Sequence, residues 1–539
     1  MSNGAFHFPE PVNEPVLSYA PGSRERRELE AALPRVAKEQ PEIPVRVGGA
    51  EHRGGAVSTV TMPHAHREVI AKVHHATGKH VEAAIDQALR AAPAWRAMSF
   101  ADRAGIFMKA ADLLAGPWRA RVNAACMLGQ SKTCYQSEID AACELIDFLR
   151  FNVHFADRIL AEQPISSPGV WNRSEYRPLE GFVFAVTPFN FLAIALNLPT
   201  APAILGNVVV WKPATTTMLG VHVMMELLRE AGLPDGVINI VPGDGPEQGQ
   251  AALASPHLAG IHFTGSTTTF RALWRGVGER IDQYRAFPRI VGETGGKDFI
   301  VAHPSADPTA VATAILRGGF EFQGQKCSAA SRVYLPKSLA AAVTERVVSE
   351  AATIRMGDVR DFSNFMGAVI DERAFKKISG YLDLANSTAR VHTGGKAHGE
   401  TGWFIEPTFA EVDDPAHRLM QEEIFGPVVA SYTYDDARYD EVLSLIDGTS
   451  PYALTGAVFA RDRGVIAHTT ERLAECAGNF YVNDKPTGAV VGQQPFGGGR
   501  ASGTNDKAGS LWNLVRWVSP RSIKETSASP TDHRYPHMG

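Results

Sequence analysis

Short apolar runs alternate with amphipathic stretches between residues 181 and 280. Helical patterns cover residues 217–232 and 247–254, and another begins at Thr267. Four other runs have the continuous apolar character of buried strands: GFVFAVT (181–187), NVVVWKP (207–213), GVINIVPG (236–243) and AGIHFTGS (259–266). This alternation predicts a parallel sheet with helices on both faces.

The chain before residue 181 has a different character. Helical patterns dominate from about residue 81 to residue 160, and the earlier residues, rich in Pro, Glu and Arg, are expected to wrap the surface. Residues 163–180 contain many turn formers, which is typical of a linker or a projecting hairpin. Prolines and asparagines interrupt the most apolar stretch, 191–211, so it is predicted to be a buried helix, turn and strand rather than a membrane span.

Composition narrows the class of protein. A 58.2 kDa chain with 44% hydrophobic residues can build two or three domains. The net charge of −5 gives no basic footprint, so nucleic acid is not expected as a partner. Five scattered cysteines and the lack of a secretory or transit signal predict a soluble, cytoplasmic protein. No metal is predicted, because the histidines at 64–80 lack carboxylate or thiolate company at ligand spacing.

Cys327 is the first candidate for chemistry. It lies between the polar residues 323–326 and the small residues 328–331, which could begin a helix. A helix N-terminus and the neighbouring Lys326 would both favour the thiolate. A single cysteine in such a place is nevertheless more often inert, so the assignment depends on the rest of the chain.

Polar residues also follow the predicted strands. Ligands bind at the carboxyl ends of parallel strands, where Thr187, Asn190, Lys212 and Gly265-Ser266 fall. No G-x-G-x-x-G motif follows any of these strands. The Gly265-Ser266 turn could receive a phosphate on its backbone amides, but as a motif it is weak.

Seven motifs in a fixed order make the pattern specific. They are TPFNF (187–191), WKPA (211–214), FTGST (263–267), GETGGKD (292–298), GQKCSAASR (324–332), EEIFGPV (422–428) and PFGGGRASGTND (495–506). With them, the chain resembles the NAD(P)-dependent aldehyde dehydrogenase superfamily over nearly its whole length. Features such as QPIS, GKDFIVAHPSAD and VGQQPFGG are most similar to the branch that oxidises L-glutamate 5-semialdehyde to L-glutamate in proline breakdown.

The resemblance implies an α/β fold with two Rossmann-like parallel-sheet domains and a small oligomerisation hairpin. We expect an N-terminal arm and helices of the cofactor domain over 1–162, the hairpin over 163–180 and the NAD-binding domain over 181–291. The catalytic domain is expected over 292–490, followed by a C-terminal return and oligomerisation segment over 491–539. A homodimer or an assembly of dimers is implied.

The resemblance also assigns catalytic roles. Cys327 would be the nucleophile, forming a thiohemiacetal and then a thioester. Asn190 would donate its side-chain amide to the oxyanion, beside the Cys327 backbone N–H. Glu293 would be the general base for thioester hydrolysis, and its neighbours Gly292, Gly295 and Gly296 are expected to give mobile, exposed backbone. A salt bridge is the alternative role for this glutamate.

The cofactor implied is NAD. Lys212 and Glu423 are expected to hold its two riboses, and Phe425 to pack against the nicotinamide. Gly265 and Ser266 would meet the pyrophosphate, with Thr187 and Thr267, Thr268 and Thr269 lining it. Phe270 replaces a second glycine of many relatives, and Thr215 replaces a glutamate that would reject NADP.

The residues for the substrate form a smaller set. The resemblance implies that Ser328 and the backbone amides of Gly488-Ala489 hold the substrate's far carboxylate, between the rings of Phe191 and Phe496. Without the resemblance, the glycine loop would be interpreted as a surface turn. Because some relatives are fused to proline dehydrogenase and this chain is shorter, we expect a monofunctional enzyme with a possible link to a separate proline dehydrogenase.

Three alternatives remain at this stage. The chain could oxidise another short acidic semialdehyde, such as succinate semialdehyde. It could be a non-catalytic protein that kept the fold, although Cys327, Asn190 and Glu293 occur together. It could also be a thioester-forming acyltransferase, which would not need the cofactor residues.

Overall fold

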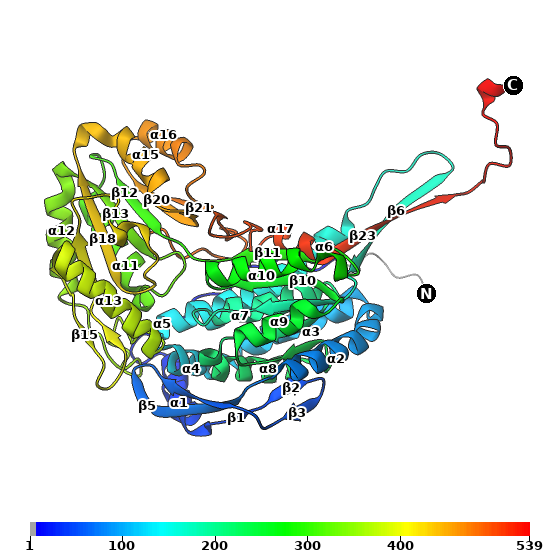
Figure 1. The fold of residues 1–539 in the computed structure, drawn as a ribbon, viewed down its shortest axis with the longest axis horizontal. Coiled ribbons are helices and arrows are strands. Elements are labelled where there is room, and N and C mark those ends of the chain that lie inside the picture. Colours follow the sequence, from blue (N-terminus) through cyan, green and yellow to red (C-terminus); the bar gives the residue numbers. More distant parts are fainter. Residues whose placement is uncertain (1–6) are drawn as a thin grey trace.

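The computed structural model describes residues 7–539 and has two lobes (Figure 1). Each lobe is built on a seven-stranded, mostly parallel sheet. The larger lobe contains most of the chain up to β11, and the smaller lobe, at the upper left of Figure 1, contains α11–α13, α15, α16 and the strands between them.

The sheet of the larger lobe contains the strands predicted from the apolar runs. Its order is β11-β10-β7-β8-β9-β2-β3, and β11 to β9 are parallel. The two N-terminal strands add antiparallel pairs at one edge. The bounds are β2 Val45–Val47, β3 Ala50–His52, β7 Phe182–Val186, β8 Val208–Lys212, β9 Ile238–Ile240, β10 Leu258–Thr264 and β11 Arg289–Glu293.

Helices cover this sheet because their apolar faces become buried by packing against it. The predicted helical region before residue 161 is confirmed, and a π-helical segment, Glu138–Glu144, interrupts it. The helices of this lobe are α1 Arg24–Glu39, α2 Gly78–Ala97, α3 Phe100–Ala115, α4 Arg119–Gln130, α5 Cys134–Ser137, α6 Leu145–Ala161, α7 Leu192–Ile204, α8 Met218–Ala231, α9 Gly245–Ala254, α10 Thr267–Glu279 and α17 Leu511–Leu514.

The sheet of the smaller lobe has the order β14-β17-β18-β13-β12-β20-β21 and is parallel except for β14. Its strands are β12 Asp298–Ala302, β13 Ala330–Pro336, β14 Arg390–Thr393, β17 Thr408–Glu411, β18 Val428–Tyr434, β20 Thr455–Phe459 and β21 Asn479–Val482. Its helices are α11 Pro308–Phe320, α12 Lys337–Ala351, α13 Glu372–Thr388, α14 Arg418–Gln421, α15 Tyr439–Thr449 and α16 Arg463–Arg472.

The N-terminal region is more regular than the sequence suggests. Residues expected only to wrap the surface include helix α1, whose Leu29, Leu33 and Val36 are buried. A three-stranded sheet, β1-β5-β4, follows it and was not predicted. Its strands are β1 Glu42–Ile43, β4 Val57–Met62 and β5 Ala65–His74.

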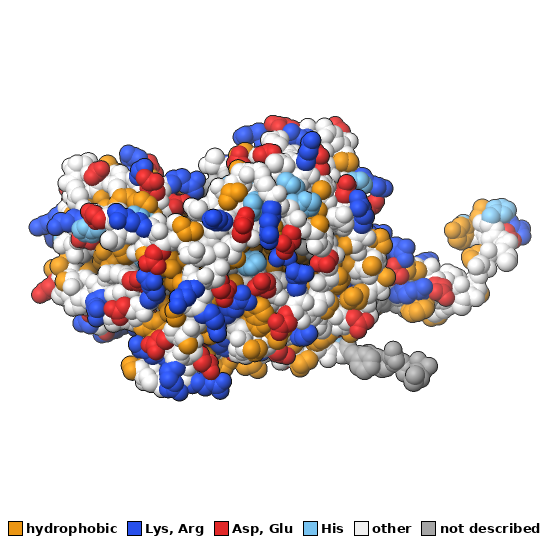
Figure 2. Space-filling view, turned by 90° about the horizontal axis from the view of Figure 1, so that it is seen from below, with side chains coloured by type: hydrophobic (Ala, Val, Ile, Leu, Met, Phe, Trp, Pro, Cys, Tyr) orange, Lys and Arg blue, Asp and Glu red, His pale blue; other side chains and the backbone are white. Residues whose placement is uncertain are grey.

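The segment 163–180 projects from the body, but it is not a hairpin by itself. Its strand β6, Val170–Pro178, pairs antiparallel along its whole length with β23, Val518–Thr526, from the C-terminal segment. Figures 1 and 2 show this two-stranded ribbon extending clear of both lobes. Across the face in Figure 2, positive and negative side chains are interspersed.

The apolar stretch 191–211 forms helix α7, a turn and strand β8 in the core, as predicted. No helix within residues 7–539 has the length and apolarity that crossing a membrane requires. The histidines near residue 70 make hydrogen bonds: His66 with Gly399 O, His74 with Glu42 and His75 with Ser58.

The remaining elements are short. The small strand pairs are β15 Ala397–His398 with β16 Phe404–Ile405 and β19 Tyr452–Ala453 with β22 Gly499–Arg500. The 3-10 turns are Thr215–Thr217, Ile281–Gln283, Glu321–Gly324, Asp436–Arg438, Val515–Trp517 and Pro536–Met538.

Candidate active site

A cleft of about 890 Å³ lies at the carboxyl ends of the parallel strands, where residues of the two sheets face each other. It brings together ten of the residues singled out from the sequence: Thr187, Asn190, Lys212, Gly265, Ser266, Thr268, Thr269, Cys327, Glu423 and Phe425. Chain segments more than 200 residues apart therefore share one site, as expected for a ligand at strand ends.

Strands β7 and β8 position Thr187 and Lys212 side by side. The backbone N–H of Thr187 donates to Lys212 O at 3.1 Å, and its hydroxyl accepts from the Trp211 indole at 2.9 Å. Burial lowers the pKa of Lys212. Because no side-chain partner holds its ammonium within residues 7–539, this group is available to hydroxyls of a ligand in the cleft.

The start of helix α10 forms one end of the cleft. Ser266 caps the helix by accepting from the Thr269 N–H at 3.2 Å, and Gly265, Ser266, Thr268 and Thr269 line the cleft. Thr267 does not line it, because its hydroxyl donates to Thr294 at 3.1 Å. A helix N-terminus of this kind favours an anionic group.

Cys327 lies in a turn, but the predicted helix after it is wrong. Residues from Ala330 form strand β13, and Ala330 pairs with Asp298 of β12. The helix next to the thiol is instead α11, which ends at Phe320 before the turn begins. The dipole argument for an activated thiolate therefore does not apply.

The electropositive setting expected around Cys327 is also wrong. Burial raises the pKa of the thiol well above its usual range, and the carboxyl groups of Asp298, Glu293 and Glu423 raise it further. Lys326 does not offset them, because its ammonium is paired with Glu321 at 3.1 Å. These surroundings therefore favour the protonated thiol over the thiolate.

Asn190 is held against the loop that carries the nucleophile. The residue is 3% exposed, and its Nδ2 donates to the backbone oxygen of Gln325, two residues before Cys327, at 3.1 Å. One N–H of the amide is occupied by this bond. The other has no partner among residues 7–539 and is available to an oxyanion in the cleft.

Glu293 ends strand β11 but does not line the cleft. Its Oε2 accepts from the Gly498 N–H at 3.3 Å. Burial raises its pKa well above the usual range, while Gly498 and Lys507 lower it and Asp506 raises it. The carboxyl group is therefore protonated more readily than an exposed one, as a proton acceptor near neutral pH requires.

The glycines around Glu293 are buried, not exposed as expected. A Cβ would lie 2.2 Å from the Phe270 ring at Gly292, 2.4 Å from the Glu423 carboxylate at Gly295, and 2.3 Å from Cys327 O at Gly296. Close packing therefore explains these glycines better than flexibility does.

Glu423 and Phe425 come from the loop before β18. Glu423 accepts from the Gly296 N–H at 3.0 Å, and burial raises its pKa. Phe425 has a positive φ of 61°, and its ring meets the edge of Phe189 with centroids 5.7 Å apart. This ring pair brings Phe189, which the sequence analysis did not single out, into the wall of the cleft.

A second group of candidate residues lies beside the nucleophile. The Ser328 side chain is buried, and its Oγ lies 2.8 Å from Oγ1 of Thr487. Gly488 follows with a positive φ of 99°, and Ala489 is half-buried. Thr487 was missed, although its hydroxyl adjoins the predicted glycine loop in the sequence.

The aromatic candidates have different surroundings. Phe191 meets Phe322 edge to face at 6.3 Å, and the Lys132 ammonium lies 4.2 Å from one ring centroid and 4.4 Å from the other. Lys132 is paired with Asp140, and nothing in the sequence pattern pointed to it. Phe496 exchanges two backbone hydrogen bonds with Ala508.

Comparison with known proteins identifies the class. Residues 52–523 match the aldehyde dehydrogenase family, and the chain belongs to this family. The chain is 49% identical to the mouse (Mus musculus) mitochondrial delta-1-pyrroline-5-carboxylate dehydrogenase over 530 residues, which cover 98% of this chain and 94% of the mouse protein.

Solved structures agree with this and confirm the expected α/β fold. The crystal structure of the Delta-pyrroline-5-carboxylate dehydrogenase from Mycobacterium tuberculosis bound with NAD is 52% identical, has a TM-score of 0.96, and is matched over 100% of both chains. Proline utilization A from Bdellovibrio bacteriovorus is 30% identical with a TM-score of 0.91, over 97% of this chain and 54% of that chain.

Proposed function

We propose that this protein is an NAD-dependent dehydrogenase that oxidises L-glutamate 5-semialdehyde, the open form of 1-pyrroline-5-carboxylate, to L-glutamate in proline degradation. The main support is that Cys327 and Asn190 line the same cleft as Lys212 and Glu423. The buried hydroxyls of Ser328 and Thr487 lie beside the nucleophile. The relatives that bear this name support the substrate assignment.

The first half of the reaction belongs to Cys327 and Asn190. The thiol proton passes to water as the sulfur attacks the aldehyde carbon, and the electron pair of the carbonyl double bond moves to the oxygen, which becomes an oxyanion. The free N–H of Asn190 and the Cys327 backbone N–H donate to that oxyanion. One such hydrogen-bond donor stabilises the transition state by about 3 kcal/mol. Loss of hydride from the thiohemiacetal leaves a thioester on Cys327.

The second half belongs to Glu293. As a carboxylate it takes a proton from water while the water oxygen attacks the thioester carbon. The C–S bond then breaks, and the same proton passes to the departing sulfur, which regenerates the thiol. In the present conformation Glu293 bonds to Gly498 and does not line the cleft, so it has to turn toward Cys327. Burial and the bond to Gly498 have opposite effects on its pKa, so this movement also changes its basicity.

The cleft fits NAD by its own donors and acceptors. We assign Lys212 and Glu423 to the ribose hydroxyls, Gly265 and Ser266 at the start of α10 to the pyrophosphate, and Phe425 to the nicotinamide end. That all of them line the cleft supports this assignment. When bound, the nicotinamide supplies the hydride acceptor. Thr215 carries no charge that would repel a 2′-phosphate, so the preference for NAD over NADP is part of the proposal.

The substrate carboxylate is assigned to Ser328 and to the amides of Gly488 and Ala489. Ser328 adjoins the nucleophile in the chain, so a ligand bound through both spans only a few bonds. Phe191 and Phe496 are assigned to the aliphatic part. We also assign cofactor binding to 181–291 and catalysis to 292–490.

Assembly and location complete the proposal. The β6–β23 ribbon exposes Trp171 and two strand edges, which favours pairing with a second copy in a homodimer or an assembly of dimers. A cytoplasmic location and a separate proline dehydrogenase as partner are proposed from the sequence. The mouse relative is mitochondrial by name, and proline utilization A is a longer chain.

Steady-state kinetics with NAD and NADP across a panel of semialdehydes tests the proposal. We expect glutamate semialdehyde with NAD to give the highest kcat/KM, with one glutamate formed per NADH. A higher value for succinate semialdehyde would support the rival dehydrogenase. Turnover of acyl groups without any binding of NAD would support the acyltransferase.

A further inference from the structure

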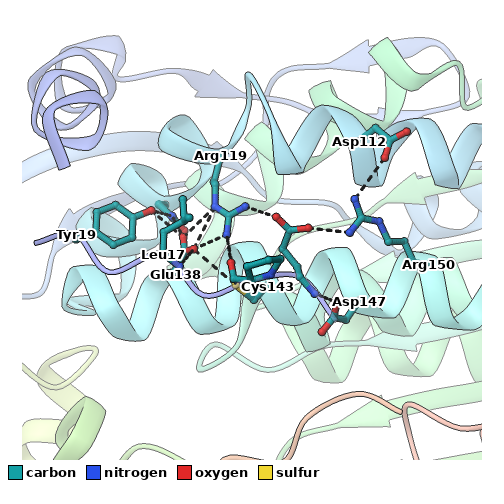
Figure 3. Close-up of polar contacts among 11 residues, drawn as sticks. Leu17, Tyr19, Asp112, Arg119, Glu138, Cys143, Asp147 and Arg150 are labelled. Atoms are coloured by element: carbon teal, nitrogen blue, oxygen red, sulfur yellow. Dashed lines mark hydrogen bonds and ion pairs between the residues drawn. The ribbon is translucent and has the colours of Figure 1, made fainter. Parts of the chain in front are cut away.

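An extended N-terminal segment, residues 7–20, crosses the helices of the larger lobe without forming regular structure. Glu14 bridges Arg119 of α4 at 2.5 Å and Arg150 of α6 at 2.7 Å. Figure 3 shows the same two arginines, with Arg119 also reaching Glu138. We call residues 13–19 the strap.

The strap is fixed at its other end by Glu138. This carboxylate accepts from the Leu17 N–H at 2.9 Å and from the Tyr19 hydroxyl at 2.7 Å, and all three residues are labelled in Figure 3. Because Glu138 and Arg119 are both buried, these bonds hold the strap in one place on the body.

Asn13 connects the strap to the loop assigned to the substrate carboxylate. Its Nδ2 donates to Asp147 Oδ2 and to Val491 O, both at 2.8 Å, and its Oδ1 accepts from Gln493 Nε2 at 2.8 Å. The Glu14 N–H also donates to Asp147 at 2.7 Å. One amide thus joins helix α6 to the loop.

The loop is bonded within itself mainly at residues 490–494, where the Gln493 and Gln494 N–H groups donate to Val490 O at 3.0 and 2.9 Å. Residues 483–498 contain no helix or strand, and Gly488 and Gly492 have positive φ values of 99° and 78°. The Thr487 hydroxyl holds the near end to Ser328, and the Gly492 N–H bonds to Gly509 O at 3.2 Å. Asn13 supplies two further bonds just beyond Ala489.

We propose that Asn13 is a positioning residue for the substrate-carboxylate site, fixing the Gly488 and Ala489 amides through Val491 and Gln493. The inference rests on the proposed function, because it needs that loop to bind the carboxylate. Without the Asn13 amide, the buried Val491 carbonyl loses its partner and the loop samples more positions. Binding must then order the loop again.

Loss of Asn13 should affect only substrates that carry a carboxylate. Cys327, Asn190 and the cofactor residues are held by other elements. Glu293 meets the loop only at Gly498, and the preceding Gly497 N–H donates to Asn479 at 3.2 Å, so that end is fixed without Asn13. An aldehyde without a carboxylate therefore does not depend on the part of the loop that Asn13 holds. Loss of Asn13 should therefore raise KM for glutamate semialdehyde and leave kcat/KM for pentanal nearly unchanged.

The test compares Asn13→Ala with wild type on glutamate semialdehyde and pentanal, with NAD in both cases. We expect kcat/KM for the semialdehyde to fall about tenfold, mostly through KM, and that for pentanal to change by less than about twofold. Asn13→Asp should lose at least as much, because its carboxylate would face Asp147 and the Val491 carbonyl. The control is Val12→Ala, because this residue is 81% exposed and adjoins Asn13 in the sequence.

A second variant guards against misfolding. Gln493→Ala removes the loop's own bond to Asn13 from an exposed position, so it should fold and show a smaller loss of the same kind. Equal losses on both aldehydes, or no loss in either variant, would overturn the inference. If wild type itself does not prefer the semialdehyde to pentanal, the proposed function fails instead.

Discussion

Replacing Ser328 with Ala removes one hydroxyl from beside the nucleophile. In the structure Ser328 is 6% exposed, and its hydroxyl lies 2.8 Å from the Thr487 hydroxyl. If it donates to the substrate carboxylate, the lost bond is charge-assisted and contributes about 1.5–3 kcal/mol. That corresponds to a loss of roughly tenfold to a hundredfold in kcat/KM for glutamate semialdehyde.

Pentanal, which has no carboxylate, distinguishes a role of Ser328 in binding the substrate carboxylate from a role in supporting Cys327. Ser328→Ala also removes the neutral bond to Thr487, about 1 kcal/mol, but this affects the protein equally with either substrate. Pentanal should therefore keep its kcat/KM within about twofold. Thr487→Val is the matched control, because it breaks the same hydroxyl pair and leaves the Ser328 donor in place.

The assay is initial-rate NADH formation with both aldehydes for wild type and the two variants. Thermal unfolding of each protein checks that the fold is unchanged. Equal losses of the two substrates in Ser328→Ala would refute the reasoning, since Ser328 would then only support Cys327.

Three further outcomes follow from the site. Cys327→Ala should abolish oxidation while NAD binding, measured by titration, stays within about threefold of wild type; more than a few percent residual activity would exclude this thiol. Glu293→Gln should give a single burst of NADH and then a slow steady state in stopped-flow, whereas a parallel loss of burst and steady state would remove Glu293 as the deacylation base. Burial and nearby carboxylates raise the pKa of Cys327, so the thiolate fraction should keep increasing with pH beyond the ordinary thiol pKa of about 8.5. The rate of alkylation by iodoacetamide should increase in parallel. A plateau of that rate near neutral pH would contradict this.

The sequence predicted the sheet of the larger lobe well because its strands are buried on both faces. Strands β7, β8 and β10 appear as continuous apolar runs, and the polar residues at their ends meet in the cleft. Strands β1, β2 and β3 were missed because two or three residues leave no periodic signal. The longer strands β4 and β5 were missed because their buried and exposed residues do not alternate regularly.

Contacts between residues far apart in the sequence explain the other differences between the predicted and the observed structure. The small residues 328–331 could begin a helix by sequence alone. In the structure Ala330 pairs with Asp298 of the neighbouring strand, and this long-range pairing makes it part of a strand. The ribbon at 163–180 depends on β23, whose partner residues lie more than 300 positions away. The charge around Cys327 could not be predicted, because Asp298, Glu293 and Glu423 become its neighbours only in the folded chain.

The discrimination of wild type between glutamate semialdehyde and pentanal, with NAD, tests the central claim most directly. Ser328 and the two backbone amides together should contribute a net 3–4 kcal/mol after desolvation of the carboxylate, or roughly a hundred- to a thousandfold in kcat/KM. A ratio in that range is the predicted result. Equal kcat/KM values for the two aldehydes would contradict the assignment and leave an aldehyde dehydrogenase without a carboxylate site.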